Sequence, residues 1–196
     1  ALGNHQLRQD FLRYGGAEGP LSWRAMIGTL YGRGFARDQG IRIMDDYNAF
    51  QSTGRGELKL DKNTILTLTG GHQNASSNNE TLDYFNLQWE KRLEDGSMWQ
   101  LRWTESYIFR HGCTNYFSGS NNYLFNRADT RSREDIFEVQ HNILFGRHNL
   151  VWGGDYSRDV YRSSPRNDQQ NTIPEDFAND QVSMFIEDEI ELADDL

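Results

Sequence analysis

The 196-residue chain has one cysteine, three prolines and no long apolar run. The single cysteine, Cys113, excludes an internal disulfide framework. No stretch approaches the ~20 consecutive apolar residues of a transmembrane helix. No signal peptide is visible, and the chain begins Ala1-Leu2-Gly3, as a processed protein or a cut fragment does. The sequence therefore argues against a disulfide-based scaffold and against a membrane-spanning helix within the chain.

Positive charge and aliphatic residues are also scarce. There are 20 Lys and Arg against 29 Asp and Glu, a net charge of −9, which argues against nucleic acid as a partner because such proteins normally present a basic face. Hydrophobic residues make up 36%, yet aromatics reach 13% and glycines number 18. This composition has fewer aliphatic residues than a soluble domain of this size usually carries, and too many aromatic residues for a disordered chain. It suits a barrel with a wet interior, since only half of each strand must then be apolar.

Catalytic motifs are missing. The chain contains no G-x-S-x-G, H-E-x-x-H, C-x-x-C or P-loop pattern. Paired carboxylates are frequent, but without a pocket they indicate no acid–base chemistry. We therefore expect no enzyme, no catalytic residue and no cofactor.

What the chain does have is an apolar–polar alternation with a period of two, the signature of β-strands. In residues 84–90, Phe85, Leu87 and Trp89 alternate with polar neighbours, and residues 99–106 repeat the rule. Residues 137–143 follow it with His141 as an exception on the apolar side. Nine strands are predicted, over residues 5–14, 20–32, 47–60, 63–72, 81–93, 97–110, 134–145, 148–160 and 181–192.

The predicted connections alternate in length. Short ones fall at 15–19, 61–63, 94–97 and 146–148, and longer polar ones at 33–46, 73–80, 111–133 and 161–180. Outer-membrane barrels have this pattern, with tight periplasmic turns on one rim and long external loops on the other. The sequence therefore predicts an all-β, up-and-down antiparallel meander of about 8–9 strands that is part of a transmembrane β-barrel.

Four segments resemble TonB-dependent outer-membrane receptors, and their order and spacing span roughly the whole chain. Residues 12–16 (LRYGG) followed by 21–25 (LSWRA) are similar to early barrel strands of that family. Residues 151–156 (VWGGDY) resemble its aromatic-Gly-Gly strand, which runs outward to a long loop. Residues 185–190 (FIEDEI) resemble the F-x-Q-D-E strand after that loop, with Glu187 in place of Gln, and the turn at 94–97 also fits.

The resemblance implies a barrel of about 22 strands around an N-terminal plug. Such receptors import scarce nutrients, usually ferric siderophores, cobalamin or other metal chelates, with energy delivered through TonB. On this interpretation residues 1–196 are a single domain, the N-terminal part of the barrel, because they include no plug, no TonB box and no terminal aromatic strand. We expect the bacterial outer membrane as location. The expected partners are outer-membrane lipid, the plug, the remaining barrel strands, TonB and a small metal-chelate substrate.

The tryptophans and the polar residues between them are the first two groups of candidate site residues. Amphipathic rings gather at membrane interfaces, so we interpret the tryptophans as a membrane girdle, the alternative being the core of a soluble barrel or sandwich. They are Trp23, Trp89, Trp99, Trp103 and Trp152. The polar residues are expected to face the lumen or plug, the alternative being a solvated sheet face, and Arg102 and Glu138 are placed to pair across strands. They are Arg24, Asn86, Gln88, Arg102, Glu138, Gln140 and Asn142.

A third group lies in the predicted loop 111–133. His111, Tyr116, Phe117 and Tyr123 are external-loop ligand candidates, because an aromatic-rich loop suits an apolar-faced chelate. His111 and Cys113 put a nitrogen and a sulfur ligand two residues apart, a pair that suits a soft metal. Two ligands do not make a site, so no metal site is predicted.

Two further functions compete with the transport barrel. One is a soluble or periplasmic β-barrel that binds a small apolar ligand, since about eight strands enclose room for one ligand. The other is a small membrane barrel that acts alone. The alternation of loop length favours a membrane protein, and the order of the motifs favours a part of a receptor.

Overall fold

The structure is a computed structural model that describes residues 7–32, 47–75, 80–119, 122–165 and 176–190, without the side chains of residues 7, 47, 111–128 and 164–165. These residues form nine strands: β1 (Leu7–Glu18), β2 (Leu21–Gly32), β3 (Tyr47–Lys59), β4 (Thr64–Ala75), β5 (Glu80–Arg92), β6 (Met98–Gly119), β7 (Asn122–Phe145), β8 (His148–Pro165) and β9 (Asp176–Ile190). No helix long and apolar enough to cross a membrane occurs in this part of the chain.

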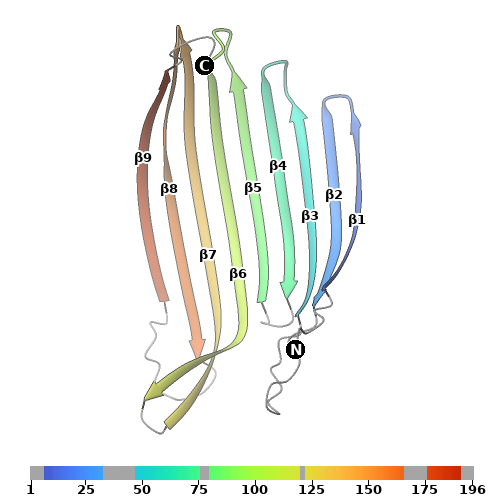
Figure 1. Ribbon diagram of the computed structural model, residues 1–196, viewed down its shortest axis with the longest axis vertical. Coiled ribbons are helices and arrows are strands. Elements are labelled where there is room, and N and C mark those ends of the chain that lie inside the picture. Colours follow the sequence, from blue (N-terminus) through green and yellow to red (C-terminus); the bar gives the residue numbers. More distant parts are fainter. Residues whose placement is uncertain (1–6, 33–46, 76–79, 120–121, 166–175, 191–196) are drawn as a thin grey trace, which may run out of the picture.

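The strands form one sheet in the order β1 to β9, so every neighbour in sequence is also a neighbour in space (Figure 1). Each of the pairings is antiparallel. The predicted all-β, up-and-down antiparallel meander is therefore confirmed. The sheet is open, because within the described residues β1 and β9 each pair on one side only.

Three of the four predicted long connections are shorter in the structure than the sequence predicts. The predicted loop 111–133 is occupied by strand, because β6 runs to Gly119 and β7 begins at Asn122, with a register shift between Arg110 and Cys113. This stretch lacks a regular apolar alternation, and its strand character comes from the backbone hydrogen-bond ladder between β6 and β7. The connection predicted at 73–80 is reduced to residues 76–79. The connection predicted at 161–180 is reduced to residues 166–175, because β8 runs to Pro165 and β9 begins at Asp176. Connection length therefore does not divide the two rims as strictly as the sequence predicts.

The predicted short turn at 15–19 also shrinks, to Gly19 and Pro20. Gly15 and Gly16 belong to β1 and pair with Arg24 and Trp23. A Cβ at Gly15 would lie 2.5 Å from the Trp23 carbonyl oxygen, so glycine here allows the close approach of two strands.

The four short turns lie together at one end of the sheet (Figure 1). Glycines with positive φ stand in three of them, Gly19, Gly96 and Gly146. In the β5–β6 turn the Ser97 hydroxyl and N–H donate to the Asp95 carboxylate, at 2.6 and 2.9 Å, and these bonds lower the pKa of Asp95. In the β3–β4 turn the Asn63 N–H and the Thr64 hydroxyl donate to Asp61, at 2.7 and 3.0 Å, and lower the pKa of Asp61.

The described sheet is a single layer without an apolar core of its own. Among the described residues, Ala49 and Ala75 are the buried hydrophobic ones, whereas large apolar side chains such as Phe137 and Met184 are 50% and 85% exposed. Folded domains normally bury an apolar face against a second layer. The partner of this face must therefore be something other than the described strands.

Candidate functional site

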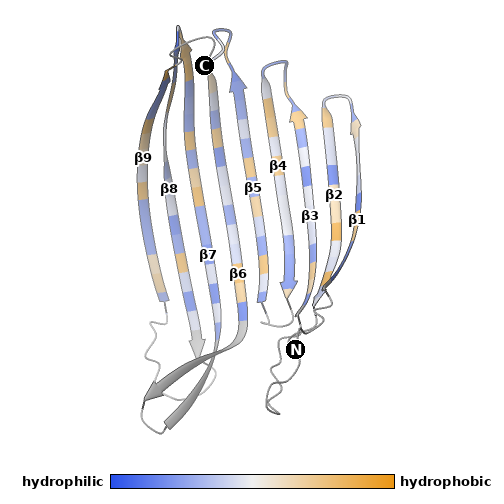
Figure 2. Cartoon of the chain, viewed as in Figure 1, coloured by the Kyte–Doolittle hydropathy of each residue, from blue (hydrophilic) through white to orange (hydrophobic). Residues whose placement is uncertain are grey.

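The strand register gathers the apolar side chains of successive strands on one face. Trp89 lies opposite Leu101, Leu101 opposite Val139, and Val139 opposite Gly154, which faces Met184. We call this side the apolar face and the opposite side the polar face. Figure 2 shows the alternation of hydrophobic and hydrophilic residues along the strands that produces the two faces.

The apolar stretch on this face has a defined depth. In β9 it is bounded by Asp180 and Asp188, which enclose Val182, Met184 and Ile186. The flanking charged residues in β1 (Asp10 and Glu18) and in β5 (Asp83 and Lys91) have the same eight-residue spacing. Eight residues span about 26 Å along a strand, or about 20 Å along the normal of a bilayer crossed at a tilt of ~40°. That depth is close to the ~25 Å apolar band of outer-membrane barrels.

The apolar band runs obliquely across the strands. We define a row as the residues that face one another in register across successive strands. One row is Tyr14, Ala25, Gly54, Gly70, Phe85, Glu105, Asp135, Arg158 and Asp180. It is uncharged from β1 to β5 and charged from β6 to β9. The band of apolar residues therefore shifts along the register from one edge of the sheet to the other.

All five tryptophans lie on the apolar face. Trp89, Trp99 and Trp152 stand toward the short turns, and the ring of Trp99 meets that of Trp152 edge-on at 5.5 Å. Trp103 stands at the opposite margin, next to Glu105 on the same face, and packs edge-on against Phe85 at 5.4 Å. The fifth, Trp23, packs edge-on against Tyr14 at 5.4 Å. Aromatic rings thus stand at both margins of the band.

His141, the exception in the alternation, belongs to the tryptophan cluster. Its ring stacks on Trp99 with 3.9 Å between the centroids and meets Trp152 edge-on at 5.8 Å. Its Nε2 atom is buried without a hydrogen-bond partner in the structure. The imidazole therefore fills the position of an aromatic residue in this cluster.

The seven predicted lumen-facing residues all lie on the polar face, and the structure links most of them. Arg102 and Glu138 form the expected cross-strand ion pair at 3.1 Å. The Asn86 amide donates to the Thr104 hydroxyl at 2.8 Å, and the Gln140 amide donates to Asn142 at 2.8 Å. The Gln88 amide donates to the Glu90 carboxylate. Ion pairs and side-chain amide hydrogen bonds of this kind suit a water-exposed surface, since the side chains of Arg102 and Glu138 remain 38% and 40% exposed.

The remaining candidate, Arg24, lies apart from this network. It faces Arg55 in the register, and both line a hollow of 740 Å³ together with Arg13 and Glu57. Arg55 pairs with Glu57, whereas Arg13 and Arg24 have no ion pair with any residue that the structure describes. The sequence singled out Arg24 alone, because β1 and β3 have the weakest alternation.

Two aromatic residues of the polar face lie over glycines of the neighbouring strand. The Tyr84 ring covers Gly71, where a Cβ would come within 2.5 Å of the ring. The Phe185 ring covers Gly153, where the Val139 carbonyl oxygen leaves no room for a Cβ. Such pairs protect a glycine in a strand with an aromatic ring from across the sheet. Sequence reasoning missed them because they depend on the register.

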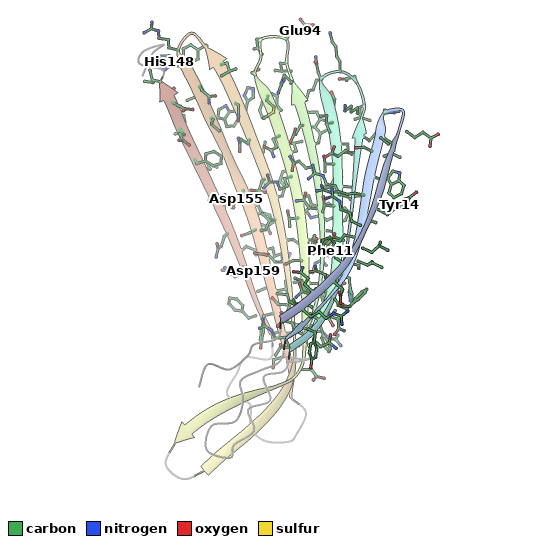
Figure 3. All side chains as sticks on the ribbon, turned by 45° about the vertical axis from the view of Figure 1, so that its right-hand side comes forward. Phe11, Tyr14, Glu94, His148, Asp155 and Asp159 are labelled. Carbon is green, nitrogen blue, oxygen red and sulfur yellow. The ribbon has the colours of Figure 1, made fainter. Side chains whose placement is uncertain are left out.

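Further charged side chains lie at the end of the sheet with the short turns and along β8. Figure 3 shows Glu94 and His148 at the end with the short turns, and Asp155 and Asp159 along β8. His148 bonds to Asp188 at 2.9 Å on the apolar face, and Ser183 donates to Asp155 on the polar face. No group of three or more His, Cys, Asp or Glu side chains that could hold a metal occurs among the residues searched in the described ranges.

The external-loop candidates lie in strand backbone. His111, Tyr116 and Phe117 belong to the extension of β6 and Tyr123 to that of β7. Their side chains lie outside the described part of the structure, so their role as chelate ligands stays a prediction.

No protein-family model matches the chain, and no curated protein matches it in sequence.

Proposed function

We propose that the chain forms part of the wall of an outer-membrane transport barrel for energised, TonB-coupled uptake of a metal chelate such as a ferric siderophore. The observation that carries the membrane part of the proposal is the exposed apolar band, which has charged margins and crosses the strands obliquely. Lipid acyl chains would cover this band, and the polar face would line a water-filled interior. Tryptophans at both margins support the same orientation.

The transport part of the proposal comes from the resemblance to TonB-dependent receptors. The segment 151–156 lies in β8, which runs away from the short turns, and the segment 185–190 lies in β9, the next strand. That order is the one the family has on either side of an external loop. The runner-up function, a self-contained barrel with a small apolar ligand, needs an enclosed apolar pocket. Large apolar side chains of the described sheet, such as Phe137 and Met184, are exposed and not enclosed in a core, which favours the transport barrel.

The membrane part is tested with tryptophans on opposite faces of one strand. Two variants of the chain carry a single tryptophan, at Trp103 or as Thr104→Trp, with the other tryptophans replaced by Phe. Reconstituted in phosphatidylcholine vesicles with brominated acyl chains, the Trp103 variant should be strongly quenched and the Thr104→Trp variant weakly, because Thr104 bonds to Asn86 on the polar face. Equal quenching of the two variants contradicts the proposed orientation.

The transport part needs a separate test in intact cells. Cells that express the gene should take up a radioiron-labelled ferric chelate, and a protonophore should abolish that uptake because energised import depends on the proton-motive force. Uptake that persists in the presence of the protonophore argues against TonB coupling.

A further inference from the structure

Four arginines gather at the margin of the apolar face that lies away from the short turns. Arg131 and Arg133 of β7 and Arg158 and Arg162 of β8 line a hollow of 460 Å³, together with Tyr107, Asp135 and Val160. In the register Arg131 faces Arg162, and Asp135 faces Arg158. Like charges directly opposite each other destabilise a sheet unless an anion lies between them.

The carboxylates of this margin do not pair equally with all four arginines. Arg133 is well paired, with Glu105 at 3.1 Å and Asp135 at 3.0 Å. Arg158 and Arg162 are 3.8 and 4.0 Å from Asp180 and Asp176, at the limit of an ion pair.

Arg131 is the least paired of the four arginines. Its guanidinium lies over the Phe109 ring at 5.5 Å, and no ion pair joins it to the described residues. Arg162, which it faces, is 69% exposed. Arg131 and Arg162 thus present two guanidinium groups to one incoming anion.

A second hollow continues the first into the apolar band. It measures 380 Å³ and shares Arg133, Asp135 and Arg158 with the first, but its other walls include the rings of Trp103, Phe137 and Tyr156. An anionic group and an apolar chain on one molecule match this pair of hollows. Guanidinium groups bind phosphate oxygens with two parallel hydrogen bonds, so a phosphate is the anion that this arginine set fits.

We propose that this arginine margin binds the phosphate headgroup of an anionic lipid, whose acyl chains lie on Trp103, Phe137 and Tyr156. The inference rests on the proposed function, because acyl chains reach these rings only where the apolar face meets a bilayer. Free phosphate shares the chemistry of the headgroup but has nothing to place on the aromatic rings. The lipid is therefore expected to bind more tightly than inorganic phosphate.

The test uses the chain with Trp103 as its single tryptophan, in vesicles that carry brominated acyl chains either on phosphatidic acid or on phosphatidylcholine, at equal mole fraction. Quenching should be stronger by the brominated phosphatidic acid. Arg131→Gln should lower this preference roughly 5-fold, and Arg131→Gln with Arg162→Gln roughly 30-fold. The matched control, Arg13→Gln with Arg24→Gln, removes two unpaired arginines from the polar face and should leave the preference unchanged.

The outcomes separate this inference from the proposed function. Equal quenching by both lipids, or a preference that survives Arg131→Gln with Arg162→Gln, overturns the lipid site while lipid contact at Trp103 still supports the proposed function. Absence of quenching by either lipid overturns both. Millimolar inorganic phosphate that abolishes the preference overturns the lipid assignment in favour of a free-phosphate site.

A second measurement covers the case in which the single-tryptophan chain does not fold. The unmodified chain should broaden the ³¹P resonance of phosphatidic acid in mixed vesicles more than that of phosphatidylcholine. The Arg131→Gln, Arg162→Gln double variant should remove the difference, and a difference that persists overturns the assignment.

Discussion

Val139→Arg places a guanidinium in the middle of the apolar band, and its effect on stability reports what the band contacts. Val139 faces Leu101 on one side and Gly154 on the other. In a barrel wall, an arginine at the bilayer midplane destabilises the fold by about 2–4 kcal/mol. This corresponds to roughly a 30- to 1000-fold increase in the equilibrium constant for unfolding.

Two matched substitutions isolate the effect of depth and of face. Val160→Arg makes the same change on the same face, but at the charged margin, opposite Arg133, about 20 Å along β7 from Val139. Its expected cost is about 1 kcal/mol, because arginine near the interface reaches water while the like charge of Arg133 opposite repels it weakly. Gln140→Arg changes the residue next to Val139 on the polar face and costs about 1 kcal/mol, for the lost hydrogen bond to Asn142.

The assay is urea unfolding from phosphatidylcholine vesicles, followed by tryptophan fluorescence with a common m-value as the check on two-state behaviour. Val139→Arg should be the most destabilising of the three by at least ~1 kcal/mol. If the free energies of unfolding of the Val139→Arg and Val160→Arg variants agree within about 0.5 kcal/mol, the middle of the apolar face lies no deeper in the bilayer than its margin, and the reasoning is refuted.

Three further predictions concern the fold itself. Gly153→Ala should destabilise the sheet by about 1–3 kcal/mol in the same assay, because a Cβ there meets a carbonyl oxygen and an aromatic ring, whereas Gly54→Ala, with open space around it, should be nearly neutral. The β5–β6 turn should be stable above pH 4 and weaken on acidification, because the pKa of Asp95 in the folded chain lies below its ordinary 3.8. Amide exchange in the turn measures this loss of stability, and Asp95→Asn should remove most of the pH dependence. A double-mutant cycle on Arg102 and Glu138 should give a coupling of about 0.2–1 kcal/mol, as for a solvated pair, and a coupling well above that range means that the polar face is sealed from water.

The sequence predicts the middle of the sheet well because the alternation there is enforced by two different environments. Strands β5 to β8 carry regular apolar positions, and their predicted spans agree with the structure to within a few residues near the short turns. Beyond the apolar band neither face has to be apolar, so the alternation fades while the backbone ladder continues. For this reason the sequence predicts a loop over 111–133, where β6 and β7 extend over residues 111–119 and 122–133.

The candidate site could be predicted as two sets of residues but not as contacts. A period of two assigns Trp103 and Arg102 to opposite faces without any structure. The partner of each residue across the sheet depends on the register, which the sequence does not reveal. Arg131 faces Arg162, and the Phe185 ring covers Gly153. Both contacts depend on the register and could not be predicted from the sequence.

The oblique course of the apolar band is the feature that joins the local pattern to the membrane proposal. A period of two defines two faces and leaves open what each face contacts. A planar slab crossed by tilted strands requires the apolar residues of each successive strand to shift along the register. Tyr14 in β1 and Arg158 in β8 share a row, yet one lies inside the band and the other at its charged margin. A tilted sheet in a bilayer gives these two residues different depths, and so accounts for their different chemistry.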